Sequence, residues 1–168
     1  MIWPPKQPTK QSQLLTRGAD FLQLLQQLLK RHIYVSVSLN GIREDLSTIT
    51  QSVCYTTVQL EAYAREAKTF DWPNFVQLQD AAVATYRLCH ETRSDSQRLN
   101  ELVDQLGVES SAVETAIRKV RDLLADIRKK PVVSDAEIDG YEAEMMMIGQ
   151  NTMKVSEGDF ILPKPASI

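Results

Sequence analysis

Two cysteines and two histidines are the side chains in this sequence whose types could support metal binding or covalent chemistry. If the chain folds back on itself near residue 71, Cys54 would lie close to Cys89, with His90 beside it. Thiolates and imidazoles bind zinc, but a structural zinc site uses four ligands, and neither a CxxC nor an HxxxH spacing occurs here. We therefore expect no metal and no cofactor, and we interpret both cysteines as small residues packed between helices. A disulfide between them is the alternative in an oxidising compartment.

The sequence contains no arrangement typical of a catalytic site. Cys89 and His90 are neighbours, so on a helix their side chains point about 100° apart and cannot form a nucleophile–base pair. His32 falls on an apolar seam, where a histidine is more often a packed core group than a catalyst. No ExxH pair, glycine-rich phosphate loop, Walker motif or GxSxG is present. We expect that the protein is not an enzyme and has no catalytic or cofactor-binding residues.

Composition and charge narrow the class of protein. The 168 residues are 43% hydrophobic and 24% charged, as in an ordinary folded domain. The formal net charge is −3, whereas nucleic-acid binders usually carry a basic excess, so we expect no nucleic-acid partner. No apolar run approaches the roughly 18 residues of a membrane span, and no apolar signal core is visible. We expect an intracellular protein, cytoplasmic or nuclear; export without a cleaved signal is the alternative.

A long helix is predicted over about residues 11–69, a stretch without proline. Apolar or small residues recur there at alternating spacings of three and four, which is typical of a coiled-coil-like helix. These seam positions are Leu14, Gly18, Phe21, Leu25, Leu28, His32, Val35, Leu39, Ile42, Leu46, Ile49, Val53, Thr56, Leu60, Tyr63 and Ala67.

One stretch of this helix also fits a strand. Residues 33–39 alternate with period two and are rich in β-branched side chains, and Asn40-Gly41 could form a hairpin turn after them. The seam passes through the stretch without a break, so we predict helix, with a kink at Gly41.

Three further helices are predicted, at about 72–106, 111–130 and 135–148. Asp71 and Pro73 are suited to begin the first of them, and Gly107 is suited to end it. Capping boxes at 111–114 and 134–137 begin the other two. The seam of helix 72–106 is Phe75, Leu78, Ala82, Thr85, Cys89, Thr92, Ser96, Leu99, Val103 and Leu106.

The predicted fold class is all-α. Helix 72–106 and helix 111–130 together match the length of helix 11–69, so we expect a long antiparallel helical hairpin in which residue i faces residue 142 − i. At one end the hairpin broadens into a three-helix bundle. Residues 11–148 form a single domain, flanked by an extended Pro-rich arm at 1–10 and an extended tail at 149–168.

The predicted function is that of a non-catalytic structural or adaptor subunit. It would assemble with other helical proteins through coiled-coil packing in a multi-subunit complex, because a slender two-helix arm is marginally stable alone. The alternatives are a self-associating helical-bundle scaffold, and a secretion or assembly chaperone or exported helical component of a bacterial or viral system. The expected partner-binding residues are Leu22, Leu24, Leu29, Ile49, Val53, Leu60, Trp3 and Phe160.

Overall fold

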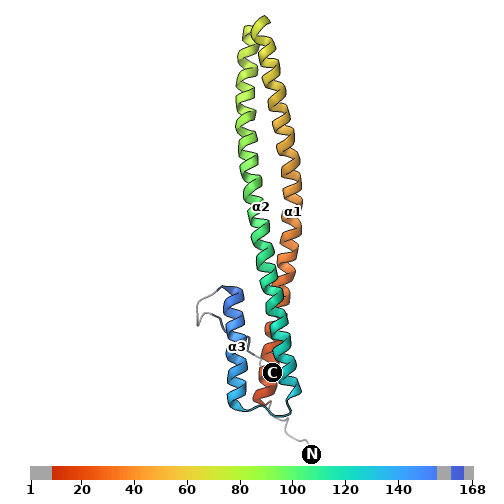
Figure 1. Cartoon of the computed structure of the whole chain (residues 1–168), viewed down its shortest axis with the longest axis vertical. Coiled ribbons are helices and arrows are strands. Elements are labelled where there is room, and N and C mark those ends of the chain that lie inside the picture. The colour runs from red at the N-terminus through yellow and green to blue at the C-terminus, as the bar shows by residue number, and fades with distance from the viewer. Residues whose placement is uncertain (1–8, 155–159, 165–168) are drawn as a thin grey trace, which may run out of the picture. The chain divides into compact units, whose positions relative to one another are not determined.

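The computed structural model consists of three helices and contains no strand in the residues it describes, 9–154 and 160–164. Helix α1 spans Lys10–Phe70, α2 spans Trp72–Lys129 and α3 spans Asp135–Met153 (Figure 1). The all-α prediction is confirmed, and residues 33–41 are helical rather than a strand and turn. Residues 1–8 of the predicted Pro-rich arm lie outside the described residues.

Short polar side chains set the beginnings of the two long helices. The Thr9 hydroxyl accepts a hydrogen bond from the Ser12 amide at 3.1 Å, and the Asp71 carboxylate accepts one from the Asn74 amide at 3.3 Å. Each bond satisfies an amide that has no partner within its own helix. Helix α1 ends at Phe70 and α2 begins at Trp72, so the chain reverses at Asp71, as the sequence predicts.

The predicted break after Leu106 is wrong, because α2 continues through Gly107 to Lys129. Ser111 lies inside this helix, and its carbonyl accepts a hydrogen bond from the Thr115 hydroxyl at 3.0 Å. A glycine within a helix costs only about 1 kcal/mol relative to alanine. Two new helix ends would leave backbone groups without partners, so a continuous helix is the more stable arrangement.

Helix α3 begins where it was predicted and ends later. Ser134 and Glu137 form the predicted capping box, but Gly149 does not end the helix, which continues to Met153 before Lys154 adopts a left-handed conformation with φ 53°. A Cβ atom at residue 149 would collide with the ring of Phe160. Glycine at 149 therefore permits close packing, and the helix ends five residues later than predicted. Of the predicted extended tail, residues 155–159 and 165–168 lie outside the described residues.

The chain divides into two compact units, and the predicted single domain 11–148 contributes to both. Unit 1 comprises residues 1–33 and 108–168, and unit 2 comprises residues 34–107.

Unit 1 is the predicted three-helix bundle. It is formed by the first part of α1, the last part of α2 and all of α3 (Figure 1). The rings of Phe21 and Phe160 lie 5.2 Å apart, so the segment after α3 packs on α1. The buried core residues are Leu14, Phe21, Leu25, Val113, Ala116, Ile117, Val120, Leu123, Leu124, Ile127, Val133, Ile138, Met145, Ile148, Phe160 and Leu162.

Polar contacts fasten the same elements together. The Arg17 guanidinium forms a 3.1 Å ion pair with Glu142 on α3 and donates a hydrogen bond to the Pro163 carbonyl at 3.2 Å. The pKa of Lys130, which follows α2, is raised by a hydrogen bond with Tyr141 and by the charge of Glu137. The Glu137 carboxylate lies 3.5 Å from the Lys130 ammonium. These contacts hold α3 and residues 160–164 against α1 and α2.

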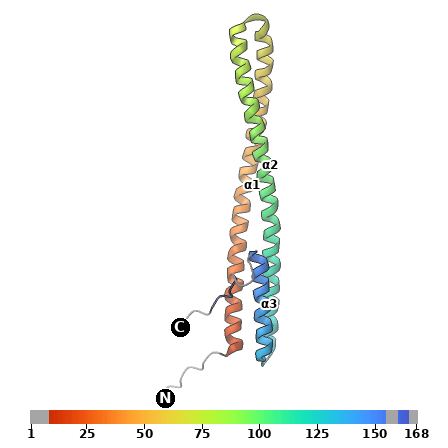
Figure 2. The same cartoon turned by 90° about the vertical axis from the view of Figure 1, so that its left-hand side faces the viewer.

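Unit 2 is an antiparallel hairpin of two helices, residues 34–70 of α1 and 72–107 of α2 (Figure 2). A disulfide joins Cys54 to Cys89 across the two helices, with their Cα atoms 5.5 Å apart. The two residue numbers sum to one more than the predicted pairing of i with 142 − i, so the predicted register is correct to within one residue.

Candidate protein-interaction surface

The predicted seam of α2 is confirmed, because all ten of its side chains are buried or half-buried. On α1, within unit 2, only every second predicted position faces the partner helix. The half-buried positions of that prediction are Leu39, Leu46, Val53, Leu60 and Ala67.

The other positions facing α2 lie one residue later than predicted. They are Ser36, Arg43, Thr50, Thr57 and Ala64, and the last two are fully buried. Packed helices usually lie 8–10 Å apart according to the side chains between them. The disulfide at Cys54 and Cys89 brings the backbones close together. Apart from Arg43, the side chains of this row are small and fit between such helices, so the row turns inward in place of its neighbours.

The larger neighbours form an exposed row on α1. We call this row, Val35, Ile42, Ile49, Thr56 and Tyr63, the outer row of α1. The exposed fractions of Ile42 and Ile49 are 54% and 52%, and that of Tyr63 is 56%. Each member lies three or four residues from a half-buried seam residue, which places it on the edge of the hairpin beside the seam.

Helix α2 carries a corresponding outer row, Asn74, Ala81, Leu88, Asp95 and Leu102. Leu88 and Leu102 are 46% and 54% exposed. Tyr63 and Asn74, one from each outer row, line the same groove, together with Ala67 and Leu78. The two rows therefore lie on one side of the hairpin, and we call that side the outer face.

The opposite side of the hairpin is more polar. There the row of α1 beside the seam is Asn40, Ser47, Cys54, Glu61 and Lys68. A second groove on this side is lined by three charged or polar residues, Glu61, Arg65 and Gln79, and by five apolar or aromatic ones, Ala64, Phe75, Ala82, Val83 and Tyr86. Of the two sides, only the outer face carries a regular apolar row on α1.

The predicted partner-binding residues are divided between surface and core. Ile49 is exposed on the outer face, where Val53 and Leu60 are half-buried in the seam beside it. Leu24 is 41% exposed on unit 1. Leu22 and Leu29 are half-buried against the core of unit 1.

Phe160 is buried within the chain itself, with 8% of its surface exposed. It packs on Phe21, so it belongs to the core of unit 1 and does not offer a surface to a partner. Trp3 lies outside the described residues.

Sequence reasoning missed the outer row of α2 and assigned that of α1 to the intramolecular seam. Leu88 and Leu102 are separated by two heptads, and Ala81 precedes Leu88 by one. That recurrence beside the α2 seam was the available signal.

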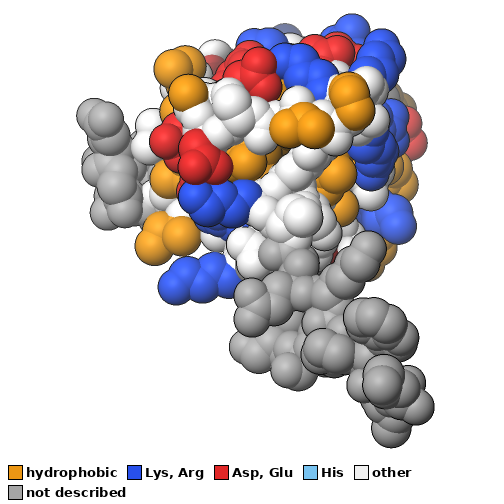
Figure 3. Space-filling model, turned by 90° about the horizontal axis from the view of Figure 1, so that it is seen from below, with side chains coloured by type: hydrophobic (Ala, Val, Ile, Leu, Met, Phe, Trp, Pro, Cys, Tyr) orange, Lys and Arg blue, Asp and Glu red, His pale blue; other side chains and the backbone are white. Residues whose placement is uncertain are grey.

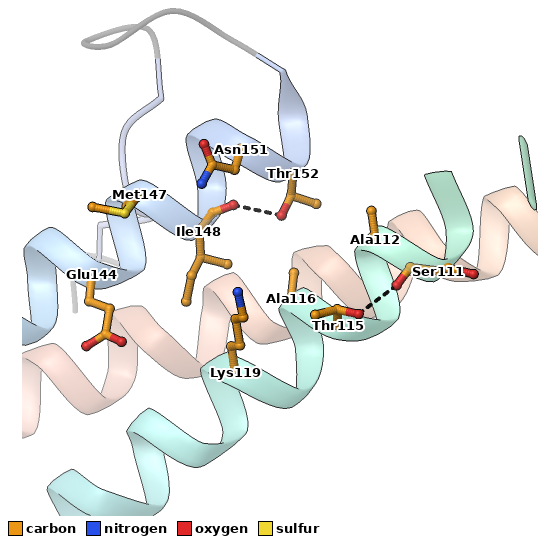
Figure 4. A pocket seen from close by; sticks show the side chains of 10 residues that line it. All are labelled: Ser111, Ala112, Thr115, Ala116, Lys119, Glu144, Met147, Ile148, Asn151 and Thr152. Atoms are coloured by element: carbon orange, nitrogen blue, oxygen red, sulfur yellow. Dashed lines mark hydrogen bonds between the residues drawn. The ribbon is translucent and has the colours of Figure 1, made fainter. Parts of the chain in front are cut away.

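Unit 1 carries a groove between α2 and α3, with a volume of about 550 Å³ (Figure 4). The α2 side is formed by small residues, Ser111, Ala112, Thr115 and Ala116, and Ile148 points toward it from α3. The Thr115 hydroxyl donates to Ser111 and the Thr152 hydroxyl to Ile148, each within its own helix. Both hydroxyl groups are thus engaged by the backbone of their own helix.

Metal ligands do not gather in the part of the chain that the structure describes. Among the described residues, no three His, Cys, Asp or Glu side chains gather as metal ligands, and no helix is long and apolar enough to cross a membrane. The Nδ1 atom of His32 is buried without a hydrogen-bond partner.

Seen from below, the end of unit 1 shows acidic and basic side chains side by side (Figure 3).

No protein-family model, no curated protein and no solved structure matches this chain, so the outer face is interpreted from its own geometry.

Proposed function

We propose that this protein is a non-catalytic structural subunit that assembles with other helices through the outer face of unit 2. The observation that supports the proposal is the apolar outer row of α1, which is exposed directly beside a half-buried seam. A helix with apolar residues on two adjacent faces can pack against two neighbours, and within unit 2 this stretch of α1 packs against α2.

Burying the outer face would contribute favourable energy to association. Fully burying an isoleucine side chain contributes about 1.5–3 kcal/mol, so burying the exposed halves of Ile42 and Ile49 would contribute about 1 kcal/mol each. Tyr63, Leu88 and Leu102 are similarly exposed. The sum of several kcal/mol is comparable to the entropic cost of association, so a complementary partner is required as well.

The disulfide bears on where such assembly would take place. Disulfides persist in oxidising compartments and are rare in the cytosol and nucleus. The cytoplasmic or nuclear location stays a prediction, and the Cys54–Cys89 bond favours the alternative of an exported helical component.

Site-specific photocrosslinking in the cells that naturally make the protein tests the proposal. A benzophenone amino acid would replace Ile49 on the outer face or, as a control, Val58, which is 57% exposed but lies away from that face. We expect crosslinks from position 49 to a helix of another polypeptide, identified by mass spectrometry, and few from position 58. Equal yields at both positions, or none at 49, would contradict the proposal.

A further inference from the structure

We infer that the helix pair received by the outer face is that of a second copy of this chain. The two hairpins would be related by a two-fold axis parallel to their length, forming an all-antiparallel four-helix bundle. This inference rests on the proposed function and identifies its partner. In this arrangement α1 of one copy lies beside α2 of the other, in the register that the Cys54–Cys89 bond sets within each hairpin.

The two outer rows complement each other in size when they are paired within one residue of that register, with residue numbers that sum to 144. Tyr63 would lie opposite Ala81 of the second copy, and Leu88 opposite Thr56 of the second copy. Large side chains facing small ones interdigitate, which is how helix interfaces fill space. Ile42 would meet Leu102 and add an apolar pair near the open end of the hairpin. Because the axis is two-fold, every pair occurs twice.

Charges beside the rows agree with this orientation. Asp45 of α1 is level with Arg98 of α2, since their numbers have the same sum as those of the disulfide. Glu66 would face Gln77 and Glu91 would face Ser52, so no two like charges meet. The reverse orientation, with full overlap of the hairpins, sets α1 against α1 and pairs Asp45 with Gln59, so Asp45 gains no basic partner there.

One residue does not match. Asp95 would lie opposite Ile49 of the second copy, where an apolar side chain would fit better. Asp95 is exposed in the hairpin, so Asp95→Leu changes the interface without disturbing the fold. This variant therefore tests whether removing the mismatch strengthens the dimer.

The first experiment measures the mass of the purified, oxidised full-length chain by sedimentation equilibrium over a range of concentrations. We expect a monomer–dimer equilibrium. Ile42→Asp and Ile49→Asp should each weaken it at least a hundredfold. Ile42→Asp places a charge against Leu102, and Ile49→Asp sets a second carboxylate against Asp95, and each contact occurs twice in the dimer. The matched controls Val37→Asp and Val58→Asp, at exposed apolar positions outside the outer face, should change it less than threefold. Asp95→Leu should strengthen it about tenfold or more.

The second experiment tests the orientation with a charge-reversal cycle. Asp45→Arg and Arg98→Asp should each weaken the dimer about tenfold, and the double variant should restore it, because exposed ion pairs are weak individually and this one occurs twice. Helicity and melting of the dilute monomer should stay the same in all three variants. Failure of the double variant to recover would overturn the parallel two-fold arrangement.

The outcomes separate this inference from the proposed function. A wild-type chain that remains monomeric at every concentration, with crosslinks from position 49 only to a different protein, overturns the second-copy inference and leaves the proposed function standing. Crosslinks from position 49 to the peptide containing Asp95, in a product of twice the chain mass, support both. A dimer that is weakened equally by the outer-face variants and the Val37 and Val58 controls overturns the inference as well.

Discussion

Small side chains allow the two helices of unit 2 to approach each other closely where Cys54 and Cys89 are bonded. Among the hairpin residues whose burial the structure describes, those that are buried are Thr57, Ala64, Ala82 and Cys89, and none is large. Their burial yields little hydrophobic energy, since that energy scales with the apolar area removed from water. The covalent bond therefore carries an unusually large share of the stability of unit 2.

Removing the disulfide is expected to destabilise unit 2 by about 3–4 kcal/mol, on the loop-entropy estimate for a separation of 35 residues. The change is Cys54→Ser with Cys89→Ser, and the measurement is chemical denaturation followed by circular dichroism. Reduction of the wild type with a dithiol should reproduce the loss, and the same reductant should leave the double variant unchanged. An identical denaturation midpoint for the oxidised wild type and the variant would refute the expectation.

Two glycines of α3 provide a second residue-scale comparison. Gly149→Ala should destabilise unit 1 by about 1–3 kcal/mol, because the new methyl group would displace the Phe160 ring. Gly140→Ala should stabilise it by about 0.5–1 kcal/mol, because that position is open and helical. Thermal melting compares the two, and equal shifts would show that Phe160 does not pack on Gly149.

At the scale of elements, α2 is one continuous helix where the sequence predicts two. Gly107 is a local signal for the end of a helix and the capping box at 111–114 for the beginning of the next, yet the helix passes through both. Glu109 and Ser110, just after the glycine, are half-buried. Continuous backbone hydrogen bonding outweighs the modest propensity cost of one glycine.

Gly107→Ala tests that continuity directly. We expect stabilisation by about 0.5–1 kcal/mol, because a helical glycine with open space around it gains from a methyl group. A left-handed glycine at a helix end would instead be destabilised by the same change. Amide hydrogen exchange of residues 104–111 in the variant and wild type distinguishes the outcomes: slower exchange supports the continuous helix, and faster exchange indicates a break.

On the scale of the whole molecule, the two units differ in what stabilises them. Among the side chains that the structure describes, the large buried ones, such as Phe21, Leu25 and Met145, belong to unit 1. Unit 2 keeps Ile42, Ile49 and several other large apolar side chains exposed. Unit 1 is therefore stabilised mainly by its own core, whereas unit 2 buries little large apolar surface and is cross-linked by its disulfide.

Hydrogen exchange of the intact protein should show this difference. Amides of 14–28 and 113–127 should exchange far more slowly than those of 36–67 at low protein concentration, because local opening is cheapest where little apolar surface is buried. A dithiol reductant should accelerate exchange in 36–67 by at least tenfold and leave the segments of unit 1 nearly unchanged. Uniform acceleration across the chain would mean that the two units unfold together.

The sequence by itself determined the helical class, the reversal at Asp71, the capping box of α3 and the seam of α2. These features follow from local chemistry: capping side chains, proline placement and the spacing of apolar residues act over a few neighbouring positions.

Only the tertiary structure decided which face of α1 turns inward in unit 2. Rows 35–63 and 36–64 are related by a shift of one residue, and hydrophobicity alone favours burying the larger row. The close approach at the disulfide selects the smaller one, and Val35, Ile42, Ile49 and Tyr63 are left exposed. In the same way, Gly107 and Gly149 resemble helix ends locally. At Gly107 the helix continues through unbroken backbone hydrogen bonding, and at Gly149 the glycine lets the Phe160 ring pack on the helix. Both outcomes depend on residues beyond the local motif.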